Sequence, residues 1–505
     1  MEKRSAYIAH PLLRENAVEK REYQENILKT AERKNTLVVL PTGIGKTIIA
    51  VLLAARRLEQ FPEEKVLVLA PSRPLVMQHR STFAAAMSVP ESELIAITGT
   101  VKPEKRISLY ETGRIIFSTP QTVENDLKEG RLSLKSFCLL VVDEAHRSVG
   151  NYSYTFVARK YMTQAEHALI LALTASPGSE EERIREICEN LFIRAVEIRT
   201  EEDEDVREYI KPVKIEIVKI PLSPELEKIR ERLKEALKER KEKLREYGFK
   251  FQTKKDLLDL QAQIGKRIDS GNSSLFPVLV LVAEALKIWH ALELLETESV
   301  TALREYMERL FKDRRKKLLR DERIKSAYFD LLGMRETHPK IEKLKEIVRE
   351  ELKRCERILV FSHYRDNILR LYRELKSVPA CKPCYLIGQA GEMGQSQREQ
   401  IETVKRFEAG EFNCLIGSPV SEEGLHIPSV DVGIFYDAVP SEIRLIQRRG
   451  RIGRVKFGKV IFLLLRNSRD EAYFYTALRK ERSMKRILKR LKETGVGRKI
   501  TLFDF

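Results

Sequence analysis

Short apolar runs alternate with longer mixed segments between residues 35 and 200. The runs are TLVVL (36–40), KVLVLA (65–70), RIIFST (114–119), CLLVV (138–142) and ALILALTAS (168–176). Strands that are apolar on both faces are typical of parallel sheets, which helices cover on both sides. We therefore expect an α/β domain over residues 1–205.

A second set of apolar runs begins after residue 350. These runs are RILVFS (357–362), FNCLIGS (412–418), VDVGIFYD (430–437) and KVIFLLL (459–465). Because helical segments again separate them, the pattern predicts a second parallel-sheet domain over residues 336–485. The expected fold class is α/β, with two such domains and a basic tail over 486–505.

Residues 206–335 have a helical pattern. Ser223 and Pro224 are an N-cap and first-turn signal. Leu226, Ile229, Leu233, Leu237 and Leu244 then recur at helical spacing among charged residues. The segment is expected to be a mostly helical, basic insertion. A helical spacer and a nucleic-acid clamp both fit this pattern.

The charge of the chain indicates a partner. Its 505 residues include 92 lysines and arginines against 75 acidic residues, a formal net charge of +17. This excess favours nucleic acid over a cationic surface that binds no ligand. The charged content of 33% is typical of thermophilic proteins. No apolar segment opens the chain, and Glu284 and Lys287 interrupt its most apolar run. We expect no membrane span and a cytoplasmic, nucleoid-associated protein.

The segment TLVVLPTGIGKT predicts a phosphate-binding loop. A strand precedes the loop, glycines let backbone N–H groups turn toward phosphate oxygens, and the following helix adds its positive end. Lys46 is expected to neutralise the outer phosphates of a nucleotide and Thr47 to bind Mg²⁺. The residues expected to hold the nucleotide here are Thr42, Gly43, Gly45, Lys46 and Thr47. Leu40 stands where the general pattern has a glycine.

The segment CLLVVDEAH supplies carboxylates at the end of a second strand. Asp143 is expected to hold the Mg²⁺ shell and Glu144 to polarise the attacking water. His146 is expected to link the nucleotide to the second domain. Together with the phosphate-binding loop, these residues predict hydrolysis of a nucleoside triphosphate such as ATP.

The segment IRLIQRRGRIGR (443–454) carries five arginines. A phosphate site in one domain needs a further cation, which an arginine of a facing domain can supply when the cleft closes. The spacing of Gln447, Arg451 and Arg454 is similar to that of a helicase motif. Arg451 and Arg454 are therefore expected to be catalytic, with Gln447 as their support.

With these motifs the chain resembles superfamily 2 helicases of the DEAH type, which have two RecA-like domains. The resemblance implies that Arg21 and Gln24 in REYQ contact the base, and that Thr174 and Ser176 in LTASP couple hydrolysis to domain movement. It also places Gly424, in GSPVSEEGLHIP, at the nucleotide. The DNA-binding residues that it implies are Arg73, Thr98, Thr119, Thr122, Ser362 and Ser418.

Within that superfamily the chain resembles the helicase portion of the archaeal Hef family, relatives of the Fanconi anaemia group M translocase. The shared segments are PTGIGKT, VVDEAHR, LTASP, QREQ, EEGL and SRDEAYF. The resemblance implies a thumb-like insertion that binds branched DNA, and a role in replication-fork repair. Hef proteins often carry a nuclease after the helicase, so a separate nuclease partner or a missing nuclease domain is expected.

Three residues depart from the family pattern: Pro419, His426 in place of aspartate, and Ile452 in place of threonine. Two alternatives stay open. The first is an RNA-dependent ATPase of the RIG-I-like type, which shares the motor and an inserted helical domain. The second is a fork-binding scaffold with a weakened motor, which rests on Pro419 and His426. In the tail GRKITLFDF, Leu502 and Phe505 have the spacing of a peptide that binds a sliding clamp (PCNA). A tail docked on its own protein is the alternative.

Overall fold

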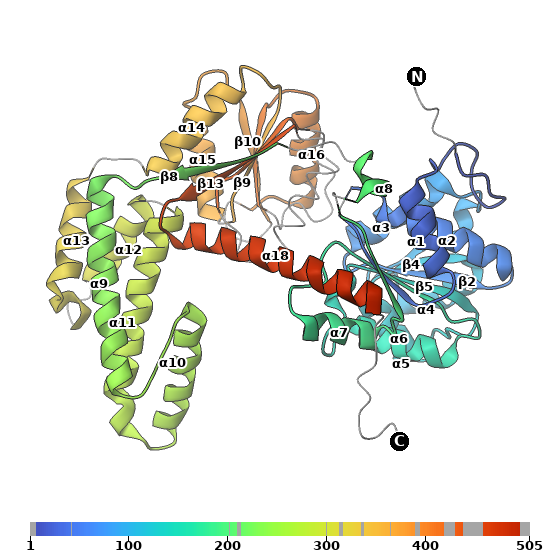
Figure 1. Cartoon of the computed structure of the whole chain (residues 1–505), viewed down its shortest axis with the longest axis horizontal. Helices are drawn as coiled ribbons and strands as arrows, with labels where there is room; N and C mark the ends of the chain where they lie inside the picture. The colour runs from blue at the N-terminus through green and yellow to red at the C-terminus, as the bar shows by residue number, and fades with distance from the viewer. Residues whose placement is uncertain are drawn as a thin grey trace.

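The chain forms two sheet domains, a helical insertion and a long helix that connects them. The computed structural model describes residues 7–41, 43–200, 203–209, 214–298, 300–312, 317–334, 338–363, 365–388, 394–418, 430–437 and 458–494. In Figure 1 the first domain lies on the right, the second at the top and the insertion on the left, with helix α18 crossing below. The predicted α/β class with two sheet domains is confirmed.

The first domain is a seven-stranded parallel sheet. Its strand order is β3-β4-β2-β5-β6-β1-β7, and every pairing in it is parallel. The strands are β1 (Thr36–Val39), β2 (Lys65–Leu69), β3 (Leu94–Ile97), β4 (Ile115–Ser118), β5 (Phe137–Asp143), β6 (Ile170–Thr174) and β7 (Ala195–Ile198). Each of the five predicted runs in this domain coincides with one of these strands to within two residues at either end.

Helices cover both faces of this sheet. The first face packs against α1 (Glu22–Ala31), α2 (Lys46–Gln60) and α3 (Arg73–Ala86). The second face packs against α4 (Pro103–Thr112), α5 (Pro120–Lys128), α6 (Ser153–Gln164) and α7 (Glu181–Asn190). The short helix α8 (Glu204–Arg207) follows β7. Because both faces are covered, the central strands are fully buried.

The second domain is a six-stranded parallel sheet in the order β10-β11-β9-β12-β13-β8. Its strands are β8 (Lys214–Ile220), β9 (Ile358–Phe361), β10 (Pro383–Leu386), β11 (Cys414–Gly417), β12 (Val432–Phe435) and β13 (Lys459–Leu465). Its helices include α14 (Pro339–Glu351), α15 (Arg365–Leu375) and α16 (Gln397–Glu408).

Strand β8 lies inside the segment that the sequence assigned to the insertion. It pairs with β13 over Lys214 to Ile220 and so belongs to the second sheet. Ile215, Ile217 and Lys219 of β8 are exposed, so the face of the sheet on which these alternate side chains lie is uncovered at this edge strand. The expected boundary at residue 206 therefore differs from the start of the helical part.

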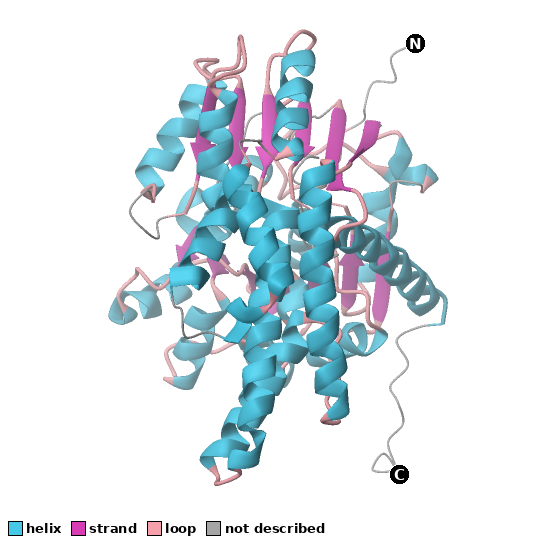
Figure 2. Cartoon of the chain, turned by 90° about the vertical axis from the view of Figure 1, so that its left-hand side faces the viewer, coloured by secondary structure: helices cyan, strands magenta, loops and turns pink. Residues whose placement is uncertain are grey.

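The insertion is a bundle of helices, as its apolar spacing predicted. They are α9 (Pro224–Glu246), α10 (Lys254–Asp269), α11 (Phe276–Glu293), α12 (Val300–Lys312) and α13 (Glu322–Gly333), and Figure 2 shows them facing the viewer. The Ser223 hydroxyl accepts a hydrogen bond from the Leu226 N–H, so Ser223 is the N-cap of α9. Two apolar clusters, around Leu233 and around Val282, hold the bundle together.

Helix α18 (Arg469–Thr494) joins the second domain to the first. It begins beside β13 and ends against the first domain, as Figure 1 shows. Met484, Leu488 and Leu491 are buried in the core on the second face of the first sheet. The expected boundary at residue 485 falls inside this helix, because one continuous apolar stripe spans it.

Among the described residues, one helical run, Ser273–Glu296, is long and apolar enough to cross a membrane. Its buried residues include Val278, Val282 and Ala285, which pack with α9 and α10 in the insertion core.

Candidate functional site

The predicted phosphate-binding loop lies between β1 and α2. Gly43 and Gly45 have φ angles of 88° and 91°, which favour glycine. Helix α2 begins at Lys46, so its first N–H groups point toward the loop. The Lys46 ammonium donates to the Leu40 carbonyl at 3.1 Å, and Thr47 lies in the first turn of α2. A loop of this shape fits a phosphate group.

Residues at the start of helix α1 contact this loop. Gln24 is 1% exposed, and its amide nitrogen lies 3.2 Å from the Tyr23 hydroxyl and 3.5 Å from the Gly45 carbonyl. The Tyr23 hydroxyl donates to the Ile44 carbonyl. The Arg21 guanidinium contacts Tyr23 at 3.5 Å and Glu19 at 3.2 Å. The two residues expected to contact a base therefore lie beside the phosphate-binding loop. The buried side-chain amide oxygen of Gln24 has no hydrogen-bond partner among the described residues.

Asp143 ends the central strand β5 and is 8% exposed. One of its carboxylate oxygens lies 2.8 Å from His79 Nε2. Burial acts to raise the pKa of the Asp143 carboxyl, but the contact with His79 and the charge of Lys46 outweigh it and lower that pKa below its ordinary value. The Tyr154 hydroxyl also donates to the Asp143 carbonyl at 2.7 Å. Asp143 is thus held ionised and in a fixed position, as a metal ligand must be.

A chain of polar contacts leads away from the acidic pair. Glu144 lies 3.2 Å from His146 Nδ1, and the same ring nitrogen lies 3.3 Å from the Thr174 hydroxyl. That hydroxyl accepts from the Ser176 N–H at 3.2 Å. The Ser176 hydroxyl in turn donates to the Met484 sulfur at 3.1 Å. Residues predicted for catalysis and for coupling are therefore connected, and the connection ends on α18.

Glu144 has a backbone conformation that is uncommon for a residue with a side chain. Its φ of 51° and ψ of 46° lie in the left-handed region. The turn sends the chain from the end of β5 into the segment with His146. Strained backbone of this kind is frequent at functional sites, and here it follows directly after Asp143.

The residues expected to grip a nucleic-acid strand lie in both domains. Arg73 begins α3 and, with Thr98, lines a hollow of 430 Å³. The hydroxyl of Thr98 is 3.0 Å from that of Thr100, and the hydroxyl of Thr119 is 2.8 Å from that of Thr122. Thr98 and Thr122 are buried. In the first domain these hydroxyls thus pair with one another.

In the second domain, Ser362 and Ser418 follow the neighbouring strands β9 and β11, so they lie at the same edge of the sheet. Ser362 is fully buried and donates to Asp437 at 2.5 Å. The Asp437 carboxylate also accepts from the His363 N–H at 2.8 Å. Burial raises the pKa of Asp437, although Lys340 and Ser362 act in the opposite direction.

Several predicted residues lie outside the described part of the chain. They are Thr42, Gly424, Gln447, Arg451 and Arg454, together with Pro419, His426 and Ile452 and the tail residues Leu502 and Phe505. Their roles stay predictions.

Two residues of the site were missed by sequence reasoning. His79 follows Val76 by three residues, so both lie on the buried side of α3; this spacing was a usable signal. Met484 precedes Leu488 and Leu491 by four and seven residues, so its burial was also recognisable. Its contact with Ser176 was not, because that contact joins segments that are distant in sequence.

Three family models match the chain in succession. "Type III restriction enzyme, res subunit" matches residues 17–179, and "Helicase conserved C-terminal domain" matches residues 339–456. Between them, "Putative ATP-dependent RNA helicase, helical bundle" matches residues 225–338. These ranges follow the two sheet domains and the helical insertion.

Curated relatives and a solved structure match over most of the chain. A putative ATP-dependent RNA helicase of Methanocaldococcus jannaschii is 42% identical over 96% of this chain and 63% of its own length. The ATP-dependent DNA helicase fml1 of Schizosaccharomyces pombe is 35% identical over 90% of this chain and 57% of its own. The chain thus spans less than two thirds of these relatives. The crystal structure of the Pyrococcus furiosus Hef helicase domain is 40% identical, with a TM-score of 0.77 over 92% of this chain and 99% of that one.

Proposed function

The chain belongs to the superfamily 2 helicase family that includes the Hef helicase domain and the Fanconi anaemia group M proteins, and on this premise we propose that it is an ATP-dependent DNA helicase or translocase. Its proposed substrate is forked or branched DNA, in replication-fork repair. The single observation that carries the proposal is the match to the Hef helicase domain over 99% of its length, insertion included.

The residues of the first domain fit Mg²⁺ and ATP. The positive φ angles of Gly43 and Gly45 shape the loop for phosphate, and the ionised Asp143 supplies a carboxylate of the kind that Mg²⁺ prefers. With Thr47, Asp143 would hold the ion, which when bound neutralises charge on the phosphate oxygens. Lys46 would bind the outer phosphates. These residues are proposed to hydrolyse ATP to ADP and phosphate.

Asp143 and Glu144 have different proposed roles. Asp143 stays ionised because His79 and Lys46 stabilise its charge, and so serves as a ligand. Glu144 is proposed to accept the proton of the attacking water, and His146 positions Glu144 at 3.2 Å. Arg451 and Arg454, supported by Gln447, are proposed to supply the remaining positive charge when the domains close.

RNA is the second candidate substrate, because three of the matching names describe RNA helicases. Backbone contacts do not separate the two nucleic acids unless the 2′-hydroxyl is read. A fork-binding scaffold with a weakened motor is the third, and rests on Pro419 and His426 alone. The clamp-binding tail and a nuclease partner also stay proposals.

ATP hydrolysis by the purified chain tests the function. The rate is measured without nucleic acid and with single-stranded DNA, forked DNA and duplex RNA, beside the Lys46→Ala variant. We expect forked DNA to give the largest stimulation and the variant to lose it. Preference for RNA would reassign the substrate, and tight fork binding without hydrolysis would favour the scaffold.

A further inference from the structure

One face of α18 carries cations that pair with no carboxylate of the described residues. Arg482, Arg486 and Lys489 are exposed, and among the described residues none of the three forms an ion pair. They follow one another at four and then three residues, so they lie within an arc of about 60° on one face of the helix. The opposite face carries the buried Met484, Leu488 and Leu491.

Other basic residues of the same helix do have acidic partners. Lys485 lies 3.3 Å from Glu481, and Lys492 lies 3.0 Å from Glu197 of β7. Arg490 pairs with Glu181 of α7. These pairs attach α18 to the first domain or stabilise it locally. Because acidic partners are available along the helix, the three unpaired cations are a distinct surface, which we call the α18 basic face.

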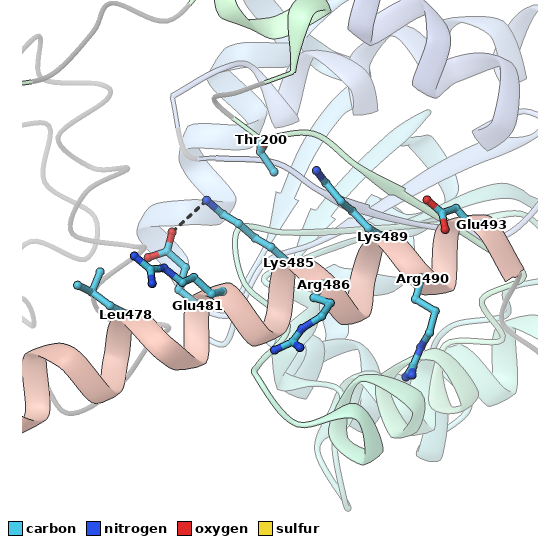
Figure 3. Close-up of a pocket in the computed structure, with 9 residues that line it drawn as sticks. Thr200, Leu478, Glu481, Lys485, Arg486, Lys489, Arg490 and Glu493 are labelled. Atoms are coloured by element: carbon cyan, nitrogen blue, oxygen red, sulfur yellow. Dashed lines mark ion pairs between the residues drawn. The ribbon is translucent and has the colours of Figure 1, made fainter.

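A hollow of 710 Å³ lies along this face. Thr200, at the end of the first domain, forms one wall, and α18 forms the other. Figure 3 shows the Lys489 side chain pointing toward Thr200 and the Arg486 side chain pointing away from it, so the two side chains diverge from neighbouring positions of the helix. Glu481 and Glu493 also line the hollow, and Figure 3 marks the ion pair of Glu481 with Lys485. The cations therefore outnumber the carboxylates here.

From this arrangement we propose that the α18 basic face binds the phosphate backbone of a nucleic-acid strand. The inference rests on the proposed function and adds a contact outside the two sheet domains and the insertion. Residues 482 to 489 span about 10 Å along the helix. About three successive phosphates of one DNA strand are spaced over that length. The spacing of the three cations therefore fits that of three phosphates.

The position of α18 gives this contact a consequence. The helix leaves the second domain at Arg469 and is anchored in the first domain through Met484, whose sulfur touches Ser176. A nucleic-acid strand bound to the α18 basic face would therefore contact the helix that connects the two domains. Binding at this face favours the domain arrangement in which α18 remains docked.

The test compares two variants that lower the formal net charge equally. The first changes Arg482, Arg486 and Lys489 to Gln. The control changes Arg349 at the end of α14, Arg354 just after it and Arg373 in α15 to Gln; all three are exposed cations of the second domain that form no ion pair among the described residues. Glutamine keeps the helix-forming tendency in both. Thermal unfolding of each variant confirms that it is folded.

The measured quantity is the affinity for forked DNA, without ATP, between about 50 and 200 mM salt. The slope of log K against log salt should fall in magnitude by between about 2 and 3 in the α18 variant and remain unchanged in the control. The single Lys489→Gln change should lower it by about 1. Equal slopes for all variants would overturn the proposal. That result would favour an acidic protein as the ligand of the α18 basic face. If the unaltered chain shows no DNA-dependent hydrolysis but the slopes still differ, the proposed function fails while this contact stands.

Discussion

The sulfur of Met484 lies 3.1 Å from the hydroxyl oxygen of Ser176, although 308 residues separate the two in the chain. Ser176 belongs to the LTASP segment of the first domain, and Met484 belongs to the helix that leaves the second. The contact therefore joins a segment proposed to couple hydrolysis with movement to the element that physically connects the domains.

Met484→Ala should loosen α18 from the first domain. Removing a buried side chain of this size costs about 2 to 5 kcal/mol of packing, and the Ser176 hydroxyl loses its acceptor. We expect faster hydrogen exchange along α18 and a lower DNA-stimulated rate of ATP hydrolysis. Met484→Leu conserves the volume and should retain docking within about 1.5 kcal/mol. Unchanged exchange in Met484→Ala would show that the ion pairs alone dock the helix.

His79→Phe should shift the acidic limb of the rate profile. The contact with His79 helps to lower the pKa of Asp143, so its loss raises that pKa toward the value that burial alone would impose. Protonated Asp143 cannot bind Mg²⁺, and the rate should therefore begin to fall at a higher pH than in the unaltered protein.

The pH dependence of kcat/KM measures this shift. His79→Gln, which keeps a hydrogen-bond donor, should move the acidic limb less than His79→Phe. If the pH profile of His79→Phe is the same as that of the unaltered protein, Lys46 alone keeps Asp143 ionised.

Gly45→Ala should weaken nucleotide binding. Its φ of +91° is strained for alanine, and the new Cβ would lie 2.8 Å from the amide nitrogen of Gln24. Gly130→Ala is the matched control, since Gly130 also has a positive φ, +69°, but open space around it. Strain of about 1 to 3 kcal/mol should lower the stability of both variants. Isothermal titration with an ATP analogue should show a loss of affinity in Gly45→Ala only; equal affinities would contradict a role for the Gln24 contact.

Arg469→Ala should free the insertion from the second domain. The Arg469 guanidinium lies 4.1 Å from the centre of the Trp289 ring and donates to the Trp289 carbonyl at 3.1 Å. Trp289 is the one tryptophan of the sequence, so its fluorescence reports on this contact. We expect a red-shifted emission in Arg469→Ala and a smaller shift in Arg469→Lys, which keeps the charge but loses the planar stack. An unchanged spectrum in Arg469→Ala would contradict the contact.

Sequence patterning located the inner strands of both sheets, and it missed the four edge strands. β3 and β7 are the edges of the first sheet, and β10 and β8 are the edges of the second. β7 (AVEI) and β8 (KIEIVKI) contain charged residues and β10 (PCYL) begins with proline, so these three lack the continuous apolar run by which the inner strands were found. β3 (LIAI) is apolar throughout and was missed all the same. The missed β8 shifted the expected start of the insertion.

The sequence by itself determined the phosphate-binding loop, the acidic pair after β5 and the helical nature of the insertion, because each depends on residues that are neighbours in the chain. Glycine spacing sets a loop, and apolar spacing sets a strand or a helix. Only the tertiary structure decided that His79 pairs with Asp143, that Met484 contacts Ser176, and that Arg482, Arg486 and Lys489 of α18 are exposed and form no ion pair with the other described residues. These relationships join distant segments, and they exist only once parallel strands and packed helices have brought those segments together.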